Sequence, residues 1–359
     1  MKLNKQLSLL LCGALMVSAL AGCGGGKDSS SASGSASDSQ SGSVSSGASS
    51  SDSYVLPNVM VLSGPTGVGA AKLMADNEAV TPEAVANGEA SPVINTATVE
   101  ADNQAVSSAL INGDVDIAAV ATNVAASLSA KSEGAVQVLA VNTLGVLYIL
   151  EKGNSVQSMA DLEGRTVYAT GQGANPEYIL NYLLTQNGLD PAADVTIQWL
   201  TAQEVTANML SAEDGVCMLP VPAATALLMK DPGVRQALDL SAEWDAVSST
   251  PLPMGCIVAR REFVEEHPEA VDAFLDLYGD SISFMSDEGN RSEAAELVAK
   301  YGITANAQIA EAAIPQCNLT LLTGEEMQDT VQAYYEVLYR ADPAAIGGSI
   351  PYDSLYYLP

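Results

Sequence analysis

Residues 58–67 have the sequence Asn-Val-Met-Val-Leu-Ser-Gly-Pro-Thr-Gly. The apolar run at 58–62 predicts a buried strand, and the glycine-rich residues after it predict a tight turn. A helical pattern of apolar residues follows at 68–77. Glycine lets backbone amides approach a bound molecule closely, and a helix that starts here favours negative or partly negative atoms. This order predicts a ligand-binding edge of an α/β sheet, although a plain tight turn would have the same pattern.

The same order of strand, turn and helix recurs along the chain. Strands are expected at 92–98, 115–120, 136–141, 146–150, 166–170, 195–200, 215–219 and 256–259. Helical patterns lie between them, and the segment from Glu262 onward is mainly helical. Such alternation predicts mostly parallel sheets with helices on both faces. The roughly 300 residues after position 53 suit two lobes better than one core.

A second glycine-rich turn, Thr-Gly-Gln-Gly-Ala-Asn-Pro at 170–176, also joins an expected strand to a helix. Two such turns, one in each expected lobe, are a stronger signal than one. Thr122 and Asn123 follow a third strand, where Asn123 is either a ligand contact or a helix cap. The candidate ligand-binding residues are therefore Ser63, Gly64, Pro65, Thr66, Gly67, Thr122, Asn123, Thr170, Gly171, Gln172, Gly173 and Asn175. The Thr66 hydroxyl and the Gly67 amide are the preferred contacts.

Composition excludes several classes of function. The chain has 14 Lys+Arg against 43 Asp+Glu, a net charge of −29, which argues against a nucleic-acid partner. Residues 64–69 have the GxxxxG spacing of a phosphate-binding loop, but Ala70 and Ala71 stand where that loop needs Lys and Ser or Thr. With one histidine, His267, and no CxxC spacing, we expect no metal, no cofactor and no catalytic residues. Cys217, Cys256 and Cys317 are either three inert thiols or one disulfide and a free thiol.

The N-terminus predicts export and anchoring. Lys2 and Lys5 precede an apolar run at 7–20, too short for a comfortable membrane span. Leu-Ala-Gly-Cys at 20–23 resembles the bacterial lipobox, which implies a signal peptide at 1–22 and lipidation of Cys23 at the outer face of the cell membrane. Residues 23–53 are mostly Gly, Ser, Ala and Asp, and predict a flexible tether to a membrane partner or a spacer without one.

Six stretches in this order resemble the solute-binding proteins of ABC importers with the type II periplasmic-binding-protein fold, and more narrowly the family that binds nitrate, sulfonates, taurine and thiamine pyrimidines. They are 64–67, 111–117, 144–148, 161–171, 174–178 and 260–268. The resemblance implies one lobe from 54–147 and 256–359, a second lobe from 148–255, and crossings near 147–152 and 250–256. It also implies a monomer that traps a small molecule between its lobes and docks on an ABC permease.

Other functions have the same bilobal shape. A TRAP-type receptor and a ligand-sensing lipoprotein are alternatives, and the resembled family also contains pyrimidine-forming enzymes with a histidine and a cysteine-rich motif. The ligand itself stays open, because neither turn contains Arg or Lys to bind an anion. Tyr178 or Trp199 would either stack on a ligand ring or belong to the core. Glu177 would either meet a ligand amine or favour the first helical turn.

Overall fold

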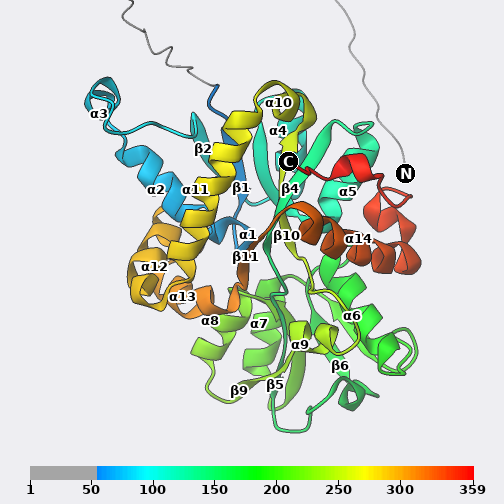
Figure 1. Cartoon of the computed structure of the whole chain (residues 1–359). Coiled ribbons are helices and arrows are strands. Elements are labelled where there is room, and N and C mark those ends of the chain that lie inside the picture. The colour runs from blue at the N-terminus through cyan, green and yellow to red at the C-terminus, as the bar shows by residue number, and fades with distance from the viewer. Residues whose placement is uncertain (1–54) are drawn as a thin grey trace, which may run out of the picture. The chain divides into compact units, whose positions relative to one another are not determined.

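The computed structural model describes residues 55–359, so the expected signal peptide 1–22, Cys23 and the linker 23–53 lie outside the described residues. Residues 55–359 belong to one compact unit (Figure 1). Within 55–359 the search for a helix long and apolar enough to cross a membrane finds none.

Two sheets organise this unit. The first has the strand order β11-β4-β10-β3-β1-β2, and the second has the order β7-β6-β8-β5-β9. The strands of the first sheet are Asn58–Leu62 (β1), Thr96–Glu100 (β2), Ile117–Ala121 (β3), Val136–Thr143 (β4), Gly255–Arg260 (β10) and Leu319–Leu322 (β11). Those of the second are Leu147–Lys152 (β5), Thr166–Ala169 (β6), Thr196–Trp199 (β7), Gly215–Pro220 (β8) and Val234–Asp239 (β9). The α/β class with two helix-flanked sheets is confirmed.

Helices connect the strands and cover both sheets (Figure 1). Up to the second sheet they are Pro65–Val68 (α1), Ala71–Ala79 (α2), Pro82–Ala86 (α3), Asn103–Asn112 (α4) and Thr122–Lys131 (α5). The second sheet adds Asn175–Gln186 (α6), Ala202–Ser211 (α7), Ala223–Lys230 (α8) and Leu240–Asp245 (α9). The C-terminal part contains Arg261–Glu266 (α10), Pro268–Ser286 (α11), Arg291–Lys300 (α12), Ala307–Ala313 (α13) and Gly324–Ala341 (α14).

The first sheet is buried on both faces. Val59 and Val61 of β1 belong to one apolar cluster with Phe274 and Tyr278 of α11. Their neighbour Leu62 belongs to the other cluster, which includes residues of α4, α5 and α14. Successive side chains of a strand point to opposite faces, so a strand buried on both faces is apolar throughout, as residues 59–62 of β1 are.

In each sheet most strands run in one direction, and one or two strands run against them. β1 pairs in parallel with β2 and β3, whereas β10 runs antiparallel to β3 and β4. In the second sheet β6 is parallel to β7 and β8, and β5 is antiparallel to β8 and β9. β5 and β10 are the strands that bring the chain from one sheet to the other, and each arrives in the direction opposite to its neighbours. The edge strand β11 is also antiparallel to its neighbour β4.

The chain crosses between sheets twice. It leaves the first sheet after Thr143 and enters the second at Leu147, and it returns between Asp239 and Gly255. Residues 147–152, expected to form a crossing, are strand β5 itself. The sequence does not predict β9 or β11. In β9, Arg235, Gln236 and Asp239 interrupt the apolar residues, and β11 has only four residues, too few to show a clear strand pattern.

A buried ion pair closes the second sheet. The Glu151 carboxylate on β5 accepts hydrogen bonds from the Ser155 and Val156 amides and from Arg235 of β9, the last at 2.5 Å. Burial by itself would raise the pKa of Glu151, but these hydrogen bonds outweigh it and hold its pKa below the ordinary value. Glu151 is 1% exposed, so the pair holds the turn after β5 against β9.

We expect Glu151→Gln to lower the free energy of unfolding by about 3 kcal/mol, because Arg235 and two amides lose a charged acceptor. A carboxylate with a depressed pKa stabilises the fold above its unfolded pKa of about 4.3, and that contribution disappears as the pH falls. Urea unfolding at pH 7 and pH 3 should therefore show a smaller loss on acidification in the variant than in the wild type.

The matched control is Glu336→Gln, because Glu336 and Arg340 form an exposed pair four residues apart on α14. This change should cost below about 0.5 kcal/mol. Equal effects of the two substitutions would contradict a structural role for the Glu151 pair.

Cys217, Cys256 and Cys317 are all free and buried. Burial raises the pKa of each thiol to about 12. The sequence allows either three inert thiols or one disulfide and a free thiol, and the structure agrees with the first. A protonated and buried sulfur is a poor nucleophile, so these thiols are inert.

Candidate ligand-binding site

The residues predicted to bind a ligand lie on both sheets, at the carboxyl ends of parallel strands. Ser63–Gly67 follow β1, and Thr122 and Asn123 begin α5 directly after β3. Because β1 and β3 are parallel neighbours, both groups lie at one edge of the first sheet. Residues 170–175 follow β6 and lead into α6 of the second sheet.

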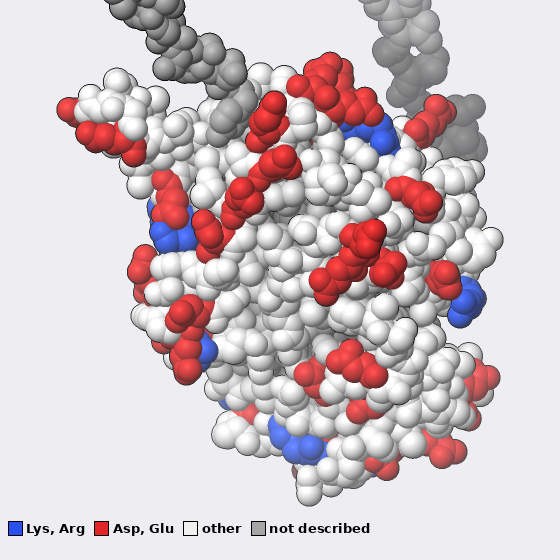
Figure 2. Space-filling model, viewed as in Figure 1, with Lys and Arg blue, Asp and Glu red and all other residues white. Residues whose placement is uncertain are grey.

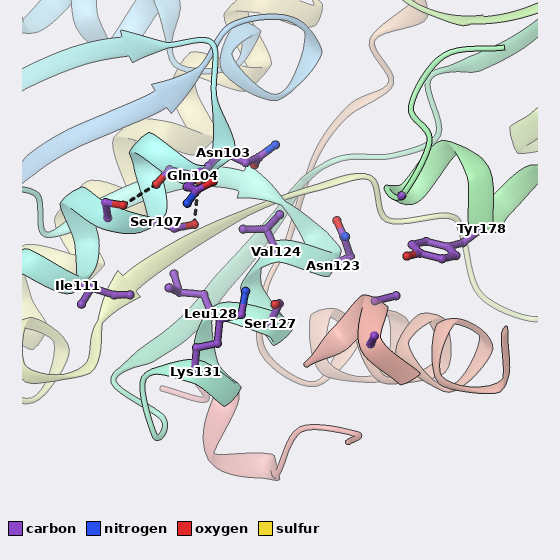
Figure 3. A pocket seen from close by; sticks show the side chains of 14 residues that line it. Asn103, Gln104, Ser107, Ile111, Asn123, Val124, Ser127, Leu128, Lys131 and Tyr178 are labelled. Atoms are coloured by element: carbon purple, nitrogen blue, oxygen red, sulfur yellow. Dashed lines mark hydrogen bonds between the residues drawn. The ribbon is translucent and has the colours of Figure 1, made fainter. Parts of the chain in front are cut away.

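One cavity of about 460 Å³ is lined from both sheets. Asn123 of α5 and Gly173 of the second turn both line it, as does Tyr178 of α6. Figure 3 shows the hydroxyl end of Tyr178 pointing from α6 toward Asn123. Of the twelve predicted ligand-binding residues, Asn123 and Gly173 are the two that this cavity includes; the other ten do not line it.

The first turn is held by internal hydrogen bonds. The Gly67 amide donates to the Gly64 carbonyl (3.1 Å), and the Gly64 amide donates to the Ile303 carbonyl (2.8 Å). A Cβ at Gly67 would lie 2.0 Å from the Leu62 carbonyl oxygen, so glycine is required there. The Gly67 amide, a preferred ligand contact in the sequence prediction, is therefore occupied within the turn itself, while Gly64 has open space beside it.

Asn142 at the end of β4 fixes this turn from behind. Its Nδ2 donates to the Thr66 carbonyl and to the Tyr278 hydroxyl, each at 2.8 Å, and its side chain is fully buried. A Cβ at Gly255 would come within 2.9 Å of Asn142 Oδ1 and of Thr66 Oγ1, so a side chain there would displace them. Asn142 and Gly255 thus position Thr66. Sequence reasoning missed both, although a polar residue directly after the apolar run 136–141 is a usable signal.

The second turn is closed by its own helix. Gly171 has φ 91°, and a Cβ on it would lie 2.5 Å from Pro176 Cγ. The Gly173 amide donates to Glu177 Oε2 at 2.6 Å. Of the two roles that the sequence allows Glu177, the structure therefore has the local one, in which its carboxylate caps the turn before α6. Thr170 is half-buried and Gln172 is exposed.

Asn175, the first residue of α6, is 3% exposed. Neither its Nδ2 nor its Oδ1 has a hydrogen-bond partner within residues 55–359. The Thr122 hydroxyl, at the start of α5, is likewise buried, and the weakly hydrogen-bonding Cys256 thiol lies beside it. A buried amide without a partner costs about 1–3 kcal/mol, so a molecule that supplied a partner to Asn175 would be favoured there.

The other candidates have separate places. The Tyr178 hydroxyl donates to Asp342 (3.4 Å), and burial, followed by the Asp342 charge, raises its pKa. Trp199 lines a different cavity together with Glu177. His267 packs against Phe263 between α10 and α11 and is absent from the lining of the two-sheet cavity. Within 55–359 no three His, Cys, Asp or Glu side chains are grouped to hold a metal ion.

Solved structures share this arrangement. The first is described as an ABC transporter from Parabacteroides distasonis; it is 22% identical, with 84% of this chain and 98% of that chain covered and a TM-score of 0.68. The periplasmic aliphatic sulphonate-binding protein SsuA from Escherichia coli is 17% identical, with 84% and 92% covered and a TM-score of 0.63. The periplasmic nitrate-binding protein NrtA from Synechocystis is 13% identical, with 76% of each chain covered and a TM-score of 0.50.

These likenesses define the class: the chain has the two-lobed fold of periplasmic binding proteins. The profile of the NMT1-like family matches residues 91–299, more than half of the chain, so the chain belongs to the NMT1-like family. No curated protein sequence matches it significantly. The family resemblance stated from the sequence is confirmed.

We expect Asn142→Ala to lower the free energy of unfolding by about 2–3 kcal/mol, because the Thr66 carbonyl and the Tyr278 hydroxyl lose a buried donor. Tyr278→Phe is the matched control: it removes one of the two hydrogen bonds and should cost about 1 kcal/mol. Urea unfolding measures both. Equal costs would show that the Asn142–Thr66 hydrogen bond adds nothing to the turn.

Proposed function

We propose that this protein is an extracytoplasmic solute-binding lipoprotein that captures a small molecule between its two lobes and delivers it to an ABC importer. The observation that carries the proposal is the cavity lined by Asn123 from one sheet and by Gly173 and Tyr178 from the other. A site built from two separate sheets binds more tightly when the two approach each other, which couples capture to a closed form that a permease can recognise.

The fold and the family support this proposal. The structural neighbours include proteins described as binding aliphatic sulphonates and nitrate. We take residues 54–147 and 256–359 as one lobe and 148–255 as the other, with the two inter-sheet connections as the hinge. The ligand walls in this proposal are Ser63, Gly64, Pro65, Thr66, Gly67, Thr122 and Asn123 on the first lobe, and Thr170, Gly171, Gln172, Gly173 and Asn175 on the second.

Binding fits the site better than catalysis. The lining of the two-sheet cavity contains amides, hydroxyls, apolar groups and one lysine, and it contains no histidine, cysteine or carboxylate. General acid–base and nucleophilic chemistry most often uses one of these groups, and the lysine, tyrosine and serines of the lining have no such group beside them in the lining to activate them. We therefore propose a binding protein rather than a pyrimidine-related enzyme.

Localisation and partners follow from the N-terminal sequence. We propose that residues 1–22 are a signal peptide, that Cys23 carries the lipid, and that 23–53 tether the protein to the outer face of the cell membrane as a monomer. Carboxylates are spread over the face shown in Figure 2, with basic side chains at few places. Such a surface keeps a membrane-tethered protein off anionic lipids and nucleic acid. An ABC permease is the partner that this arrangement serves; a TRAP transporter or a membrane sensor would need its own subunit encoded nearby.

Asn175→Ala tests the site. Because the Asn175 amide has no partner in the protein, its removal should leave the unliganded Tm unchanged or slightly higher. A ligand at 100 times its Kd adds about 2.7 kcal/mol of stability to the wild type, and the variant should lose most of this gain. Thermal unfolding with sulfonates, nitrate, pyrimidines, flavin precursors and amino acids measures it. Thr66→Ala should also weaken the shift.

Asn77→Ala is the matched control, because the Asn77 amide is fully paired with the backbone of Val93 and Ile94. It should lower the unliganded Tm and keep the ligand-induced shift. If Asn175→Ala instead unfolds the protein more readily and keeps the full shift, the amide is structural and the site lies elsewhere.

A further inference from the structure

The two-sheet cavity continues as a groove between α4 and α5 (Figure 3). Asn123 stands at one end of it, and Lys131, in the last turn of α5, stands at the other. Val124 and Leu128 form its apolar floor. The remaining helical side chains that line it are Asn103, Gln104, Ser107, Ser108, Ile111 and Ser127. The groove thus combines apolar side chains (Ile111, Val124 and Leu128) with neutral polar ones, and it has one cation at its far end.

The charge of this groove is unusual for the chain. Four other cavities, of about 320 to 490 Å³, each include at least one carboxylate in their lining. The groove has none, although the chain has 43 Asp+Glu. Two carboxylates are hydrogen-bonded to lining residues, Glu177 to the Gly173 amide and Asp342 to the Tyr178 hydroxyl, and both belong to the end of the groove away from Lys131. A negative group at the Lys131 end therefore meets less repulsion than it would in the other cavities.

Lys131 is also chemically available. Its side chain forms no ion pair and no hydrogen bond within residues 55–359. Among the Lys and Arg side chains of that range, Lys230 at the end of α8 is the other one without such a partner. In Figure 3 the Lys131 side chain runs back along α5 toward Ser127, so its ammonium group lies beside the groove. This direction is the usual one for a long side chain on a helix.

The length of the groove sets the size of its occupant. Asn123 and Lys131 are eight residues apart on one helix, and at 1.5 Å per residue their Cα atoms are roughly 12 Å apart. The Lys131 side chain runs back toward Ser127, which is four residues and roughly 6 Å from Asn123 along the helix, so the ammonium group is closer than the Cα spacing. A solute held at Asn123 and Gly173 therefore needs a chain of several atoms to reach the ammonium group. A compact anion such as nitrate would leave the groove empty.

We propose that the groove binds the distal part of an elongated solute, whose head lies between the lobes at Asn123 and Gly173 and whose other end carries an acidic group that pairs with Lys131. The apolar floor at Val124 and Leu128 accommodates the chain between the two ends. This inference rests on the proposed solute-binding function and narrows its ligand to long molecules with a negatively charged tail.

The test uses pairs of linear sulfonates and carboxylates, short and long, in which the long member either carries or lacks a terminal carboxylate. Isothermal titration of the full chain should show that the long, carboxylate-terminated member binds more tightly than its uncharged counterpart. In Lys131→Ala this preference should fall roughly fivefold, the size expected of a partly exposed ion pair, whereas Lys131→Arg should retain it. The preference should also weaken with added salt.

Two further variants keep the outcome clear. Lys230→Ala, which also removes an unpaired lysine from the last turn of a helix, should leave the preference unchanged. Ser108→Trp, at an exposed position of the lining, should exclude long members and leave short ones bound. Suppose that short members bind and lose affinity in Asn175→Ala, but that neither Lys131→Ala nor Ser108→Trp changes the preference for the long, carboxylate-terminated member. The groove inference is then wrong, and the solute-binding function stands. If no member of this panel binds, the groove inference is overturned, and the wider thermal-unfolding panel decides whether the solute-binding function stands.

Discussion

The candidate site depends on one property of parallel strands: their carboxyl ends lie at the same edge of the sheet. β1 and β3 deliver their carboxyl ends to one edge of the first sheet, and β6 and β8 do the same in the second. Each end opens into a helix whose first amides have no partner within the helix. The chain can place two such edges in one unit because β5 and β10 enter each sheet antiparallel to their neighbours. Every candidate ligand contact lies on these edges.

Most polar groups on those edges are already used by the protein. Glu177 caps the Gly173 amide, the Gly64 carbonyl accepts from Gly67, and Asn142 holds the Thr66 carbonyl. These hydrogen bonds make the two turns rigid, which lowers the entropy cost of binding. Within residues 55–359 the buried Asn175 amide stays without a hydrogen-bond partner, as do a few buried polar atoms elsewhere, such as the Tyr356 hydroxyl. A rigid frame with few open polar positions is how a binding protein obtains specificity.

The contacts between the two parts of the chain come largely from its C-terminal segment. Trp244 of α9 packs between Tyr182 of α6 and Tyr334 of α14, with ring centroids 5.1 and 5.8 Å apart. The Thr225 hydroxyl of α8 donates to Gln316, which precedes β11. Sequence reasoning identified this segment as helical and stopped there. Its role in joining the two sheets depends on pairs of residues that lie 90 or more positions apart, such as Thr225 and Gln316, and no local pattern records them.

The sequence by itself determined the strand-turn-helix units, the two glycine-rich turns and the neutral, polar character of both, because each depends on neighbouring residues and on backbone angles that glycine and proline set. It also placed Asn123 and Gly173 among the candidates, and these two line one cavity. Only the tertiary structure decided which groups stay available. Whether a backbone amide or carbonyl is free depends on distant partners such as Ile303, Asn142 and Tyr335, brought close by packing of the whole sheet.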